Sequence, residues 1–74
     1  MTKWEYLVIV CTRNFDHYRA NFYNSTELKD WKKNPPIPEY LNELGQQGWE
    51  LVSTLPVGET VGQMHLFLKR PKPE

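Results

Sequence analysis

The spacing of hydrophobic residues in the middle of the chain predicts an amphipathic helix. Four apolar side chains recur at the i, i+3, i+4 and i+7 positions that form one helical stripe: Ile37, Tyr40, Leu41 and Leu44. Pro38 fits the first helical turn, where its missing N–H needs no partner. Gly45 lies on or beside the stripe, so it indicates either close backbone packing or an early helix end.

The hydrophobic period changes at Gly48 from that of a helix to that of a strand. Glycine is favoured just after a helix, where the chain often takes the left-handed conformation. Beyond it, Trp49, Leu51, Ser53 and Leu55 alternate with Glu50, Val52 and Thr54. We therefore predict that the helix ends at Gly48 and that a strand over Trp49–Leu55 folds back under it, with Trp49 against the last helical turn.

The first strand is predicted over Lys3–Thr12. Between Leu7 and Cys11 both faces of this strand are apolar. That pattern is typical of a central strand, or of an edge strand covered by a partner subunit.

The segments on either side of the helix are less regular. Residues Tyr18–Tyr23 suit a return strand after a turn near Asn14–Asp16, although Phe15, Tyr18 and Phe22 would also fit a short helix. Glu27–Lys32 suits a third extended piece or a single helical turn. After a loop at Pro56–Thr60, Val61–Lys69 reads as a strand antiparallel to the one before it.

Together these elements predict an α+β fold with the order β-β-α-β-β. We expect an antiparallel sheet of three to four strands, with one helix packed on one face. We expect residues 1–74 to form a single domain and residues 70–74 to form a frayed tail.

Composition points to a cytoplasmic protein that self-associates. A domain of 74 residues is marginal alone, and its single cysteine cannot form an internal disulfide. Aromatic residues make up 14% of the chain, so we expect a homo-oligomer, a dimer or larger. Nine basic and nine acidic residues balance, which argues against general nucleic-acid binding. No apolar run reaches membrane-spanning length, no secretion signal is evident, and Cys11 suits a buried thiol in a reducing compartment.

The sequence contains no pattern that predicts catalysis, a metal or a cofactor. It has no glycine-rich phosphate loop, nucleophile elbow or Cys-x-x-Cys motif. His65 alternates with Phe67 on a predicted strand, where a partly exposed sheet residue is expected. His17 is the better site candidate, but Cys11 lies in an apolar strand that does not suit a thiolate nucleophile. We therefore expect no enzymatic activity.

Binding is better supported, by a segment from Arg13 to Lys33 in which aromatic and cationic residues alternate. Aromatic faces stack on planar rings, and cations pair with phosphate or carboxylate groups. The candidate ligand-binding residues are Arg13, His17, Tyr18, Arg19, Trp31 and Lys33. They would suit a nucleotide-type small molecule held at a subunit seam. The alternative is that these aromatic residues only complete the core of a small protein.

Three segments resemble a known family. Lys3–Val10 (KWEYLVIV), Leu41–Ser53 (LNELGQQGWELVS) and Phe67–Pro71 (FLKRP) are similar to the recurring pattern of the small bacterial and phage family called domain of unknown function 4177. The resemblance implies a fold but no activity and no catalytic residues. The functional expectation is a non-enzymatic binding module that self-associates, and the alternative is a sensor or sequestering protein for a nucleotide-type signal.

Overall fold

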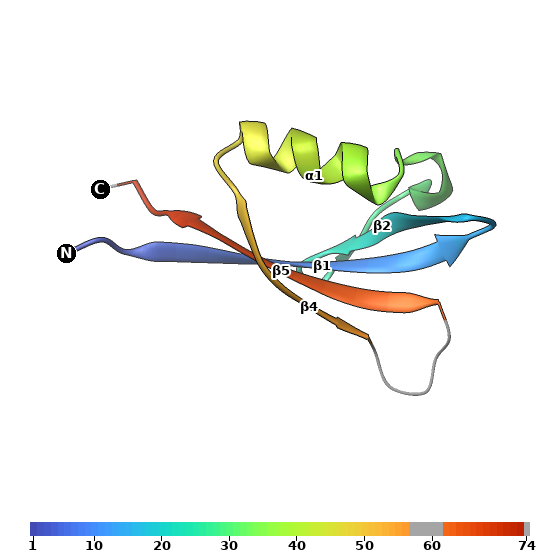
Figure 1. The fold of residues 1–74 in the computed structure, drawn as a ribbon, viewed down its shortest axis with the longest axis horizontal. Coiled ribbons are helices and arrows are strands. Elements are labelled where there is room, and N and C mark those ends of the chain that lie inside the picture. The colour runs from blue at the N-terminus through green and yellow to red at the C-terminus, as the bar shows by residue number, and fades with distance from the viewer. Residues whose placement is uncertain (57–61, 74) are drawn as a thin grey trace.

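Helix α1 (Ile37–Gln46) covers one face of a five-stranded antiparallel sheet, which makes the fold α+β as predicted (Figure 1). The computed structural model describes residues 1–56 and 62–73. The sheet order is β3-β2-β1-β5-β4. Its strands are β1 (Trp4–Asn14), β2 (His17–Tyr23), β3 (Thr26–Glu27), β4 (Glu50–Pro56) and β5 (Gln63–Pro71). No helix in the described part of the chain is long and apolar enough to cross a membrane.

Strand β1 is central, as one interpretation of its two-sided apolar pattern predicted. It pairs with β2 on one side and with β5 on the other. The β1–β2 register shifts between Val10 and Cys11, so that Val10 faces Phe22 and Cys11 faces Ala20. This irregularity leaves Asn21 as an extra residue in β2.

The predicted helix end at Gly48 is confirmed. Gly48 has φ 93°, and the Trp49 N–H donates to the Leu44 carbonyl at 3.1 Å. That bond turns the chain back, so that Trp49 is only 8% exposed. Gly45 has neither of the roles suggested for it, because the helix continues past it and a Cβ there would meet no atom within 4 Å.

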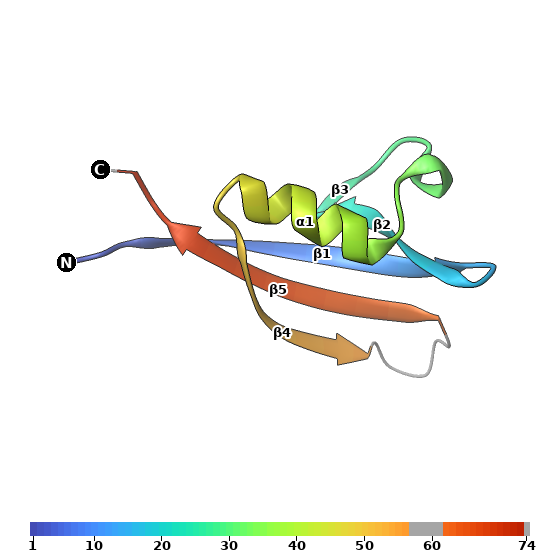
Figure 2. The ribbon, with the colours of Figure 1, turned by 45° about the horizontal axis from the view of Figure 1, so that its top comes forward.

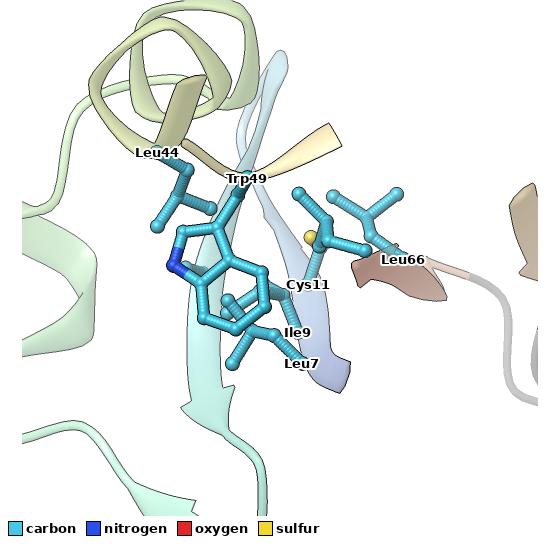
Figure 3. Packing of buried hydrophobic residues seen from close by; sticks show 8 residues of the cluster. Leu7, Ile9, Cys11, Leu44, Trp49 and Leu66 are labelled. Carbon is cyan, nitrogen blue, oxygen red and sulfur yellow. The ribbon is translucent and has the colours of Figure 1, made fainter. Parts of the chain in front are cut away.

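The hydrophobic core lies between α1 and the sheet. Figure 3 shows the Trp49 indole among Leu44, Leu7 and Ile9. The buried residues come from β1, β2, α1, β5 and the link into β4: Leu7, Ile9, Cys11, Ala20, Leu44, Trp49, Leu66 and Leu68. Burial of each large apolar side chain stabilises the fold by roughly 1.5–3 kcal/mol.

Strand β4 differs from the prediction in two ways. It does not lie under the helix: it runs along the edge of the sheet beyond β5, and all seven of its residues are exposed (Figures 1 and 2). Its alternation is also broken, because the register with β5 shifts between Leu51 and Ser53. Leu51 and Leu55 therefore point to opposite faces, since Leu51 pairs with the buried Leu68 and Leu55 pairs with His65.

The segment between β1 and α1 contains both of the predicted alternatives, extended structure and a helical turn. The β2 hairpin is confirmed, with Phe15 at its turn in a left-handed conformation of φ 59°. The two-residue strand β3 is followed by a 3-10 turn at Trp31–Lys33. The sheet exceeds the three to four predicted strands because β3 forms its fifth.

The last strand ends later than predicted. Arg70 and Pro71 belong to β5 rather than to a tail, and the Lys72 N–H donates to the Lys3 carbonyl at 2.7 Å. The start proposed for this strand, Val61, and most of the predicted loop before it lie outside the described residues.

Candidate functional site

A half-open cleft of about 290 Å³ lies where the β1–β2 hairpin meets the start of α1. Four parts of the chain line it: β1, the β1–β2 turn with the start of β2, the entry to α1, and β5. The lining residues are Cys11, Asp16, His17, Tyr18, Pro36, Ile37, Pro38 and Met64.

Strand pairing determines which residues meet in the cleft. Cys11 and Met64 are direct partners in the β1–β5 ladder and therefore share the helix-side face. Tyr18 is the partner of Arg13, two residues beyond Cys11 on the same face. An isolated bridge between Arg19 and Pro36 holds the entry to α1 beside β2. All the segments that line the cleft thus belong to one protomer.

The lining of the cleft is mainly apolar, with polar groups from Asp16 and His17, both of which are exposed. Burial raises the pKa of the Cys11 thiol from an ordinary value of 9.0 to about 12. The thiol is therefore protonated at neutral pH. Although the cleft brings Cys11 and His17 to one site, a protonated thiol does not suit nucleophilic catalysis.

Two of the six residues predicted to bind a ligand, His17 and Tyr18, line the cleft. The other four lie elsewhere. The Arg13 Nε donates to the Phe15 carbonyl at 3.0 Å, and Arg19 donates to the carbonyl of Asn34. Trp31 and Lys33 belong to the 3-10 turn. Of the six predicted residues, the cleft therefore brings together only His17 and Tyr18, while Arg13 lies opposite Tyr18 in the β1–β2 ladder.

Sequence reasoning missed four of the apolar lining residues: Pro36, Ile37, Pro38 and Met64. The sequence pattern predicts Ile37 and Pro38 only as part of the helix, and Met64 only as part of the last strand. Their juxtaposition depends on the β1–β5 register and on the Arg19–Pro36 bridge. Neither leaves a local signal in the sequence.

The sheet face opposite α1 is the second candidate site, and it is apolar. We call it the outer face. The register places eight aliphatic, aromatic or imidazole side chains on it: Trp4, Tyr6, Val8, Val10, Phe22, Leu55, His65 and Phe67. Polar residues share this face: Thr12, Glu50, Ser53, Gln63 and Lys69. Among the described residues, no helix or strand lies over this face of the sheet (Figure 1). Tyr6 is 68% exposed and Leu55 is 53% exposed.

Aromatic contacts organise the outer face. The rings of His65 and Phe67 meet edge to face with centroids 6.1 Å apart, so His65 is the partly exposed sheet residue that was expected. At the end of the sheet near the termini, the Lys69 ammonium lies 4.3 Å from the Trp4 ring centroid. Across β1, β4 and β5, this face carries one carboxylate, Glu50, and one ammonium group, Lys69, which are partners in the β4–β5 ladder.

Within residues 1–56 and 62–73, no three His, Cys, Asp or Glu side chains gather closely enough to hold a metal ion. Comparisons with protein-family models, curated proteins and solved structures find no match to this chain. The resemblance to domain of unknown function 4177 therefore stays a prediction.

Proposed function

We propose that this protein is a non-enzymatic interaction module that self-associates through its outer face and strand β4. The observation that carries the proposal is the apolar character of the outer face. An antiparallel sheet with one face on a core normally turns polar residues to water on the other face. Here that other face carries Tyr6, Leu55 and Phe67 instead.

The size of the outer face suits a second copy of the chain. Its eight aliphatic, aromatic and imidazole side chains would contribute to the roughly 800 Å² per partner that a standard interface buries. Covering it would also stabilise a domain whose own core is small.

Strand β4 adds a backbone contribution. It is the edge strand beyond β5, and its side chains Leu51, Val52 and Leu55 are 42–56% exposed. Edge strands present unpaired N–H and C=O groups that can pair with a strand of another chain.

Charge does not oppose the association of two copies. The chain has a formal net charge of zero, and proteins near zero net charge lack the repulsion that keeps copies apart.

Light scattering coupled to size-exclusion chromatography tests the proposal. We expect the full chain to elute at micromolar concentration with at least twice the protomer mass of 8.8 kDa. Leu55→Lys, on the outer face, should shift the protein toward the monomer. Gln46→Lys adds the same charge at an exposed position of α1 and should leave the mass unchanged. A wild-type chain that elutes as a monomer would overturn the proposal.

A further inference from the structure

The geometry points to the cleft between the β1–β2 hairpin and α1 as a binding site for a small, uncharged ring compound. This site is independent of the proposed self-association. Cys11, Met64 and Tyr18 belong to the helix side of the sheet, whereas the proposed interface lies on the outer face.

The volume of the cleft limits the size of its ligand. Ligand pockets in proteins usually measure about 300–1,000 Å³, and an apolar cavity of about 150 Å³ holds benzene. The cleft, with about 290 Å³, lies at the lower limit for ligand pockets and has roughly twice the benzene-binding volume. It therefore suits a compound with two fused rings.

The walls of the cleft favour an aromatic ring. Pro36, Ile37 and Pro38 present rigid aliphatic surface on one side. Met64 supplies a thioether, which makes favourable contacts with aromatic rings, and Tyr18 supplies a ring of its own. Since proline and tyrosine have few rotatable bonds, little side-chain entropy is lost when a ligand binds.

The charges at the cleft disfavour a phosphate or carboxylate ligand. Among the described residues, no lysine or arginine lines it, and the guanidinium groups of Arg13 and Arg19 in the β1–β2 hairpin each donate to a main-chain carbonyl. The rim instead holds the carboxylate of Asp16, which repels anions and accepts a hydrogen bond from a neutral donor. His17 beside it offers one further polar contact. The ligand class is thus a neutral ring with one N–H or O–H donor, and not a nucleotide.

Indole is a suitable probe, because it has two fused rings, no charge and one N–H donor. Titration of the isotope-labelled full chain with indole, followed by amide NMR, should move the signals of Cys11, Tyr18, Ile37 and Met64. The signals of β3 and β4 should stay in place. Saturation is expected in the millimolar range, as for an unoptimised fragment. Naphthalene-2-sulfonate, an anion of similar shape, should bind at least tenfold more weakly.

Substitutions provide an independent check. His17→Trp places a large ring at the cleft and should weaken indole binding by about tenfold. Glu39→Trp introduces the same side chain at an exposed α1 position outside the lining and should have no effect.

The inference is overturned if indole leaves the cleft signals of the wild-type chain unmoved, if it perturbs the outer face instead, or if the sulfonate binds as tightly as indole. Because the NMR experiment on the wild-type chain localises the probe by itself, a failure of His17→Trp to fold does not affect it. The experiment is equally informative for a monomer and for an oligomer, so its failure and the failure of self-association are distinguishable.

Discussion

The guanidinium carbon of Arg70 lies 4.2 Å from the centroid of the Trp49 ring. The same side chain forms an ion pair with Glu5, and its Nη1 donates to the Gln47 carbonyl at 2.8 Å. Arg70 therefore links β5, β1 and the residue after the last turn of α1. Arg70, which the sequence pattern places in a frayed tail, thus holds the end of the helix on the sheet.

Replacing Arg70 should destabilise the fold. Arg70→Ala removes the stacking on Trp49 and the hydrogen bond to the Gln47 carbonyl, at an expected cost of about 1–2 kcal/mol in the free energy of unfolding. Arg70→Lys should recover less than half of that loss, because an ammonium lacks the planar, multi-donor geometry. Urea denaturation measures both variants. Lys72→Ala, at an exposed neighbouring position, is the control, and an equal loss there would contradict the role of Arg70.

Gly45 and Gly48 should respond in opposite directions to the same substitution. Gly45→Ala should stabilise the protein by up to about 1 kcal/mol, because the position is helical and a Cβ meets no atom within 4 Å. Gly48→Ala should destabilise it by about 1–2 kcal/mol, because φ is 93°. Thermal and urea unfolding of the two variants give the comparison. Equal effects would show that the helix does not end where the structure ends it.

The Asn24 side chain completes the hydrogen bonding of Val8 after β2 ends. The Asn24 Oδ1 accepts from the Val8 backbone N–H at 3.0 Å, and the Asn24 backbone N–H donates to the Val8 carbonyl at 2.8 Å. Asn24 also has φ 55°. Asn24→Ala should cost about 1–2 kcal/mol, because it loses the acceptor and strains the backbone. Asn24→Asp keeps an acceptor oxygen, so its free energy of unfolding should fall by no more than about half as much. Urea denaturation distinguishes the two, and equal losses would mean that the side-chain acceptor does not matter.

The buried thiol of Cys11 should make the protein sensitive to alkali. Its pKa is raised from 9.0 to about 12, so between these values the unfolded chain releases a proton that the folded chain keeps. The unfolded state then binds fewer protons, and the free energy of unfolding falls as pH rises, by up to about 1.4 kcal/mol per pH unit. Below pH 9 both the folded and the unfolded chain keep the thiol proton, so this loss of stability is absent there.

Cys11→Ala isolates this effect. The variant should be less stable at neutral pH by about 1 kcal/mol, because packing is lost, yet its stability should fall less steeply above pH 9. A shallower slope remains, since the pKa of Tyr40 is also raised, first by burial and then by Tyr23, Glu43 and Cys11. Urea midpoints measured across the alkaline range give both slopes. Identical slopes would mean that the thiol is not protected in the folded state.

The sequence predicts the fold of this protein where a local pattern determines the structure. The change of period at Gly48, the burial of Trp49 and the central position of β1 all follow from residues close together in the chain. The exposed position of β4 does not follow from such a local pattern. A single extra residue in the β4–β5 register places Leu51 and Leu55 on opposite faces of the sheet.

The candidate sites were less predictable, because they depend on pairings between distant segments. The sequence predicts that the cations between Arg13 and Lys33 can bind a ligand. In the structure Arg13 donates to the Phe15 carbonyl and Arg19 donates to the Asn34 carbonyl. The cleft joins Cys11 with Met64, which are 53 residues apart in the chain and become neighbours only through the β1–β5 register.

The short β3 strand limits how copies of this protein could add together. It has only two residues, and the Arg19–Pro36 bridge occupies β2 next to it, so the far side of the sheet offers little backbone to another chain. A head-to-tail polymer of sheets needs two edge strands on every protomer that can pair with another chain. Chains joined only by pairing of their β4 strands would therefore form a closed pair, because the other edge of the sheet offers no comparable strand for a third chain to join.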